Sequence, residues 1–257
     1  MKRDRPYLIS DTRTLFMKYL KLTWRMPMWT LFGLVQPLLW LLIFGQLFKG
    51  LSNLPNFPAK NYVQFLTPGV IVMTVLFGAS WSGVSLLRDL RNGVMERLLV
   101  APIIRSSIVL SRLLHNGFTV VIQVSLLIIV AALIGVGLPD AQGLFLVWMI
   151  VLLLSLGFSA ISNSLAMRLQ QEEPLVVMGN LLTLPLLFFS SALVPVDFMP
   201  RWMQLVSRVN PVSYGVEAVR ACYDAQLVQP FWISIGFLAV FSGLSIAVAV
   251  AAFQKVE

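Results

Sequence analysis

Charged residues, cysteine and histidine are scarce in this sequence. Aspartate, glutamate, lysine and arginine make up 12% of the 257 residues, whereas hydrophobic residues make up 58%. The mean hydropathy of +0.84 lies far outside the range of soluble globular proteins. The single cysteine, Cys222, excludes an intramolecular disulfide. The sequence has one histidine, His115, and no paired acids inside the hydrophobic runs. An intramembrane enzyme is therefore the least favoured class, and we predict no catalytic residue and no metal site.

The hydrophobic residues gather in six long runs. They are residues 28–48, 62–87, 117–136, 143–167, 175–193 and 231–253. A helix needs about 20 residues to cross the bilayer core, and lipid offers the backbone no hydrogen-bonding partner, so such runs predict transmembrane helices. We therefore predict an all-α membrane protein with six transmembrane helices. It would consist of a cytoplasmic segment, 1–27, and a six-span domain, 28–257.

The net charge of +8 reflects where the basic residues lie. Fourteen of the 19 lysines and arginines fall on one side of the predicted spans: before the first, between the second and third, after the fourth and after the sixth. Cytoplasmic segments of helical membrane proteins carry this excess. Both termini are therefore predicted in the cytoplasm, and nucleic-acid binding is not expected. The first run has no cleavage site after it and is expected to be an uncleaved anchor.

The segment before the first run is predicted to form an amphipathic interfacial helix over residues 11–26. Lys18, Lys21 and Arg25 fall at positions i, i+3 and i+7, which is one narrow stripe of a helix. The apolar residues expected on the far side are Phe16, Leu20 and Trp24. Asp11 can cap the start of this helix, and the proline at position 27 ends it. A helix of this kind lies on anionic lipid and can also contact a cytoplasmic partner.

A short, charged stretch, 88–102, separates the second and third runs. Its apolar line at helical spacing consists of Leu87, Leu90, Val94 and Leu98. Gly93 costs about 1 kcal/mol relative to alanine inside a helix, which indicates close approach of another backbone. Pro102 ends the predicted helix. Periodicity alone leaves two interpretations open: a connector lying on lipid, or a helix that docks into another protein.

The segment 194–229, between the fifth and sixth runs, predicts a helical hairpin. Two short helices are expected, over 200–209 and 212–224, because prolines stand near each start and Asn210 and Pro211 force a turn. Both are too short to cross a membrane. The aromatic residues that favour the headgroup region are Trp202, Tyr214 and Tyr223. We expect the hairpin to dip into the outer leaflet, either sealing the bundle or gating it.

Two motifs resemble those of a known family. Residues 91–102, RNGVMERLLVAP, resemble the cytoplasmic motif of type-2 ABC exporter permeases, G-[TV]-x-E-x-L-x-x-[TSA]-P. Residues 188–220 resemble their outer motif, which has a proline after the fifth span, then P-x-W, N-P and an aromatic residue before E-x-x-R. The resemblance covers nearly the whole chain and is closest to drug-resistance permeases of the daunorubicin type, with polysaccharide-exporter permeases as relatives.

The resemblance implies a permease subunit that pairs with a second copy of itself and binds two copies of a separate cytoplasmic ATPase. The residues that it implies for coupling to the ATPase are Arg91, Gly93, Val94, Glu96, Arg97, Leu98 and Pro102. Those that it implies for an outer gate are Pro195, Pro200, Trp202, Asn210, Pro211, Tyr214, Glu217 and Arg220. Glu172 and Glu173 could add a polar contact to the ATPase.

The sequence also bears on cofactor and cargo. No stretch matches G-x-x-x-x-G-K-[ST], so we predict that ATP and Mg²⁺ bind the partner ATPase and that this chain holds no cofactor. No charged residue lies deep inside a run, which disfavours the alternative of an ion-coupled carrier or channel. The cargo is expected to be amphiphilic or hydrophobic: drug-like, a lipid or a lipid-linked glycan. The expected location is the bacterial cytoplasmic membrane, and His115 is expected to be a structural hydrogen-bonding group.

Overall fold

The computed structural model describes residues 6–25, 27–53, 59, 61–94, 98, 100, 103–225 and 227–254. Within these ranges all regular secondary structure is helical. The α-helices are α1 (Pro6–Arg25), α2 (Pro27–Leu47), α3 (Tyr62–Arg91), α5 (Arg105–Leu133), α6 (Ala141–Leu169), α7 (Glu172–Phe188), α8 (Arg201–Ser207), α9 (Pro211–Tyr223) and α10 (Gln229–Gln254). Two short 3₁₀ helices are η1 (Lys49–Asn53) and η2 (Val196–Phe198).

Four helices in the described part of the chain, α3, α5, α6 and α10, are long and apolar enough to cross a membrane. They contain 26 to 30 residues each, more than the roughly 20 that a bilayer core requires. Helix α7 is apolar but has only 17 residues, and the apolar part of α2, Leu31–Leu47, is equally short. The chain is therefore a multi-pass helical membrane protein.

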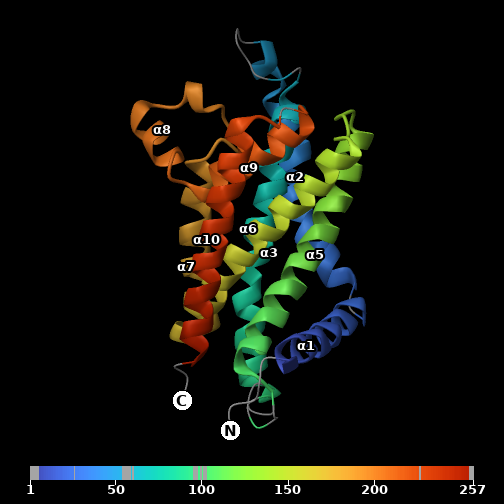
Figure 1. Ribbon diagram of the computed structural model, residues 1–257. Helices are drawn as coiled ribbons and strands as arrows, with labels where there is room; N and C mark the ends of the chain where they lie inside the picture. Colours follow the sequence, from blue (N-terminus) through green and yellow to red (C-terminus); the bar gives the residue numbers. More distant parts are fainter. Residues whose placement is uncertain are drawn as a thin grey trace.

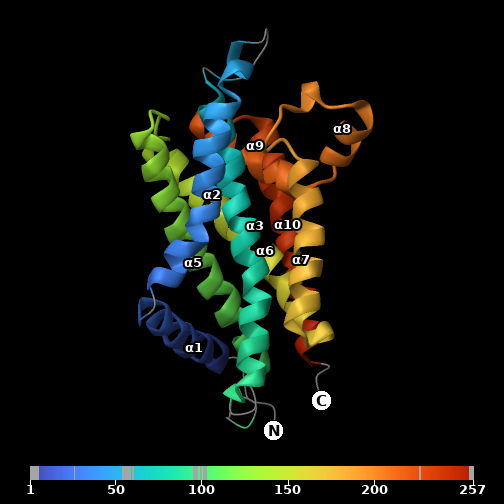
Figure 2. The same ribbon diagram turned by 180° about the vertical axis from the view of Figure 1, so that it is seen from behind.

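Six helices, α2, α3, α5, α6, α7 and α10, run side by side along the long axis of the molecule (Figure 1). Helix α3 lies between α2 and α7 and packs against both, as the view from behind shows (Figure 2). Helix α1 lies across one end of this bundle, and α8 and α9 lie at the other end. We call these the α1 end and the α9 end. The last turns of α3 and α10 lie at the α1 end, which is the arrangement expected if both termini share one side.

Helices α3 and α6 pack closely against each other. A Cβ atom placed on Gly83 would lie 2.5 Å from the carbonyl oxygen of Ser162, so only glycine allows this approach. The Gly83 N–H donates to the Ser162 hydroxyl at 3.1 Å, and that hydroxyl donates to the Ser80 carbonyl at 2.9 Å. The Asn163 amide donates to the Ser82 hydroxyl at 2.9 Å. Small residues and interhelical hydrogen bonds of this kind hold helices together in lipid, where the hydrophobic effect does not.

At the α1 end, one helix extends well beyond its hydrophobic run and one predicted helix start is wrong. Helix α5 begins at Arg105, twelve residues before the third hydrophobic run, because packing against α1 and α3 covers the polar residues of its first turns. Helix α1 begins at Pro6 rather than at Asp11, so Asp11 does not cap its start. The face of α1 that packs on the bundle centres on Leu15 and Tyr19, both buried, whereas Trp24 is 77% exposed.

Candidate functional site

The connection between α3 and α5 lies at the α1 end and carries the predicted coupling residues. Of these, Arg91, Gly93, Val94 and Leu98 lie within the described residues, whereas Glu96, Arg97 and Pro102 lie outside them. Helix α3 ends at Arg91, and Gly93 has a φ of 66°. Its N–H donates to the Leu90 carbonyl at 3.2 Å. This left-handed turn is a typical glycine helix terminus.

The predicted single helix over 88–102 is therefore wrong in its first part. Residues 88–91 form the last turn of α3, and the helix ends there, with Gly93 in a left-handed conformation just after it. Val94, Leu98 and Val100, which follow the break, are helical. The sequence signal was ambiguous, because a glycine inside an apolar helical pattern fits either a close contact or a helix end.

Glu172, in the first turn of α7, joins the end of α3. Its carboxylate accepts a hydrogen bond from Arg91 at 3.2 Å, and its second oxygen lies 3.7 Å from Arg88 Nε. The Arg91 side chain is more than half exposed and that of Arg88 is about half exposed. Each ion pair therefore contributes at most about 1 kcal/mol to stability. Arg91 and Glu172 thus contact each other, whereas the exposed Glu173 is available to a partner.

An ion pair between a buried arginine and a partly buried aspartate ties α3, α5 and α1 together. Arg112 of α5 is only 6% exposed, and its guanidinium pairs with the carboxylate of Asp89 on α3. The same guanidinium lies 5.0 Å from the ring centroid of Tyr19 on α1, in cation–π range. Sequence analysis missed this cluster, since nothing in the local pattern shows that positions 23 residues apart face each other.

Helix α1 is fastened along the first turns of α5. The Asp11 carboxylate accepts a hydrogen bond from the Ile104 N–H at 3.2 Å. The Thr23 hydroxyl lies 2.7 Å from His115 Nε2, which confirms His115 as a structural hydrogen-bonding group. Phe16 and Phe118 pack edge to face with ring centroids 6.0 Å apart.

The basic stripe of α1 faces away from this contact. Lys18, Lys21 and Arg25 are all exposed. Their contact with anionic lipid stays a prediction.

The two short helices predicted between the fifth and sixth runs are confirmed as α8 and α9. Asn210 holds their junction to the end of α7. Its side chain caps α9 by accepting from the Val212 N–H at 2.9 Å. Its amide donates to the carbonyls of Leu186 at 2.6 Å and Phe189 at 3.2 Å. Asn210 is 3% exposed, and Pro211 takes the first helical position, where its missing N–H does no harm.

The other predicted gate residues surround this junction. Pro195 and Pro200 precede η2 and α8, respectively. The Tyr214 hydroxyl donates to the Arg208 carbonyl at 2.7 Å, and its ring stacks on Phe237 of α10 at 4.2 Å. Trp202 is mostly exposed and contacts Phe189 edge to face at 5.6 Å. Helix α9 is therefore fixed to the bundle, whereas only Ser207 of α8 is buried.

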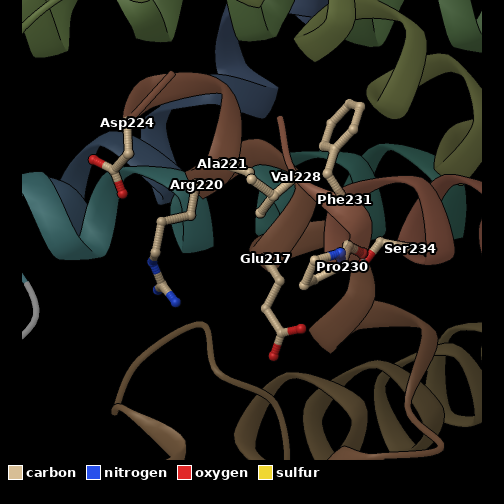
Figure 3. A pocket seen from close by; sticks show the side chains of 8 residues that line it. All are labelled: Glu217, Arg220, Ala221, Asp224, Val228, Pro230, Phe231 and Ser234. Carbon is tan, nitrogen blue, oxygen red and sulfur yellow. Dashed lines mark hydrogen bonds between the residues drawn. The ribbon is translucent and has the colours of Figure 1, made fainter. Parts of the chain in front are cut away.

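Glu217 and Arg220 line a cavity of about 230 Å³ between α9 and α10. Figure 3 shows them with Asp224, which directly follows α9, beside Pro230 and other residues that begin α10. The Arg220 guanidinium donates to the Ser191 carbonyl at 3.1 Å and lies 4.3 Å from the Phe65 ring centroid. Burial lowers the pKa of Arg220 to about 10, so it stays protonated at neutral pH. Partial burial raises the pKa of Glu217, and the charge of Arg220 opposes this shift.

The described residues offer no cluster of three or more histidine, cysteine, aspartate or glutamate side chains that could hold a metal ion. At the α1 end, Arg88, Arg91, Asp89, Arg112 and Glu172 form ion pairs between helices. At the α9 end, Asn210 and Arg220 hold the hairpin to the bundle.

Comparison with known proteins gives consistent matches along the chain. The profile of a family described as ABC-2 type transporter matches residues 10–223. The transport permease ycf38 of Cyanophora paradoxa is 35% identical over 88% of this chain and 79% of its own length. The ycf38 permease of Porphyra purpurea is 36% identical over 84% of this chain and 75% of its own. The daunorubicin resistance ABC transporter permease protein DrrB1 of Streptomyces coeruleorubidus is 30% identical over 82% and 76%, respectively.

Proposed function

Because this chain belongs to the ABC-2 type transporter family, we propose that it is the permease subunit of an ATP-driven exporter. It moves an amphiphilic or hydrophobic compound out of the cytoplasm, while a separate ATPase subunit binds ATP and Mg²⁺. The drug-resistance name of one relative supports a drug-like cargo. The six-helix bundle, whose charged clusters lie at its two ends, supports an apolar or amphiphilic one.

One observation carries the coupling proposal: the connection 92–104 joins two membrane helices that an ion pair locks together. Asp89 lies three residues before the connection, and Arg112 lies eight residues after it. A push on the connection would therefore move the ends of α3 and α5 as one body, since packed elements shift as rigid units. This is the mechanical property that a permease needs where its ATPase docks.

The docking surface proposed here is the connection after Gly93, with Glu96 and Arg97 as its charged residues and Pro102 as its end. Arg91 is assigned a different role, because its side chain is held by Glu172. Glu173 and the exposed face of α1 would flank the docked ATPase. Two ATPase copies would bind two copies of this chain.

We further propose that α2 and α7 also cross the membrane, which makes six spans with both termini in the cytoplasm. Both run alongside the four longer helices from one end of the bundle towards the other (Figure 2). Shorter spans are tolerated when the bilayer thins locally or flanking residues reach its surface. The α9 end would then face outward from a bacterial cytoplasmic membrane, and a homodimer would enclose the path.

At the outer face, α9 would seal the bundle and α8 would act as the movable part of the gate. Asn210 and Arg220 hold α9 to the ends of α7 and to α3 through the contacts described above. Helix α8 and the turn after it present an exposed apolar surface, including Trp202, Leu205 and Val209, to lipid or to the second copy.

The charge reversal Glu96→Lys tests the coupling proposal. Losing a charged contact at a protein interface commonly costs a few kcal/mol, and about 3 kcal/mol is more than a hundredfold in affinity. We expect normal membrane insertion and loss of the ATPase when the tagged permease is purified with its co-expressed ATPase. Asp197→Lys is the matched control, with the same charge change at an exposed position of the α9 end, and should retain the ATPase. Wild-type ATPase recovery with Glu96→Lys would make the connection a lipid-bound linker.

A further inference from the structure

We propose that Arg112 is a positioning residue that couples α1 to the movement of the α3 and α5 ends during transport. The inference rests on the proposed function, since it concerns how force from a docked ATPase is distributed. The cluster of Asp89, Arg112 and Tyr19 is the device: one guanidinium contacts a carboxylate on α3 and an aromatic ring on α1.

The cluster lies where α1, α3 and α5 meet. Helix α1 packs mainly on α5 and only slightly on α2, its neighbour in the sequence. Its contacts with α5 run from Asp11 at the Ile104 N–H to Thr23 at His115. Arg112 lies between these two contacts and adds a charged link to α3 beside the apolar cluster that joins the three helices. Movement of α3 can therefore reach the basic, exposed face of α1 through this side chain.

The charges of Asp89 and Arg112 also indicate a role beyond packing. Arg112 is 6% exposed and the Asp89 side chain 24% exposed. Replacing such a largely buried pair by hydrophobic residues of similar volume is often neutral or stabilising, because burying charge is costly. Stability alone therefore does not account for an ion pair here. The ion pair can stay formed while the helices slide past each other, because the carboxylate offers several acceptor positions to the five guanidinium donors. Apolar packing provides no directional contact of this kind.

One hydrogen-bond donor of Arg112 is unused. The Arg112 Nε–H is buried and has no hydrogen-bond partner among the described residues. A buried donor without an acceptor is unfavourable, so a small helix shift that brought an acceptor to Nε would be favoured. Two arrangements of one side chain, separated by a small helix movement, form the kind of bistable element that transmits motion.

Spin labels can test this movement without a known cargo. In a Cys222→Ser background, we would label Lys21→Cys on α1 and Glu173→Cys at the start of α7, both exposed. The labelled complex with its ATPase is placed in lipid vesicles, and the distance distribution is measured by pulsed EPR with no nucleotide and after trapping with ATP and vanadate. The unmodified cluster should give a shift of the main distance between the two states.

The combined variant Asp89→Leu and Arg112→Met keeps apolar packing but removes the charges. We expect the same yield, the same bound ATPase and loss of the nucleotide-dependent shift. Arg91→Gln, which breaks an exposed pair instead, should keep the shift. A second pair of variants guards against misfolding: Tyr19→Phe keeps the ring under the guanidinium and should retain the shift, whereas Tyr19→Leu should lose it.

The outcomes separate this inference from the proposed function. An unchanged shift in the charge-free variant, or no shift in the unmodified cluster with ATPase bound, would overturn the role of Arg112. Failure of any ATPase to co-purify with the unmodified chain would instead overturn the proposed function.

Discussion

The contact between Gly83 and Ser162 predicts a large effect for one added methyl group. In Gly83→Ala the new Cβ would lie 2.5 Å from the Ser162 carbonyl oxygen and 2.6 Å from its hydroxyl. The first of these is backbone, so α3 and α6 must move apart. Overpacking of this kind costs about 1–3 kcal/mol.

The same movement weakens two hydrogen bonds, from Gly83 N–H to Ser162 and from Ser162 to Ser80. Each contributes about 1 kcal/mol. Alanine regains about 1 kcal/mol of helix propensity. The net expected loss is roughly 2–4 kcal/mol, at least about thirtyfold in the ratio of folded to unfolded protein.

Unfolding in mixed detergent micelles on titration with SDS, followed by tryptophan fluorescence, measures this loss. Gly236→Ala on α10 is the matched control, because a Cβ there meets no atom within 4 Å. It should be as stable as the starting protein or slightly more so. Equal stability of Gly83→Ala and Gly236→Ala would refute the close packing of α3 and α6.

Two further predictions concern the outer hairpin and the topology. Asn210→Ala removes a helix cap and two hydrogen bonds to the end of α7, so protease added outside should cleave residues 194–229 faster than in the unmodified protein. Asn210→Asp keeps the cap, so its cleavage rate should lie between the two. Equal cleavage rates in all three proteins would contradict the anchoring role of Asn210. In a Cys222-free background, single cysteines at Asn92 and Gln171 should react only with reagent inside the cell and one at Val196 only from outside, whereas labelling of Asn92 from both sides would contradict the six-span topology.

Several features of the fold follow from local sequence. Long apolar runs located α3 and α6 within a few residues of their observed bounds, because any run that crosses lipid must be helical. The hairpin of α8 and α9 was equally predictable, since Asn210 and Pro211 combine a helix cap with a residue suited to the first helical turn.

The features that sequence analysis missed depend on partners far away in the chain. The early start of α5 requires α1 and α3 to cover its polar residues, and the pairing of Arg112 with Asp89 requires two helices to align in register. Asp11 looked like a cap for its own helix, but its acceptor oxygen serves Ile104 instead. Local patterns show which groups need a partner and leave the identity of the partner to the tertiary structure.

The docking of α1 on α5 sets an order of events during synthesis. Asp11 and Ile104 are 93 residues apart in the chain, so α1 leaves the ribosome well before its partner exists. At about 5–20 residues per second, that interval is roughly 5–20 s. During this interval no helix covers the face of α1 around Tyr19. We expect the exposed lysines of α1 to bind the surface of the bilayer until α5 is made. The α2–α3 hairpin and the first turns of α5 must therefore be made before the first helix of the protein reaches its final place.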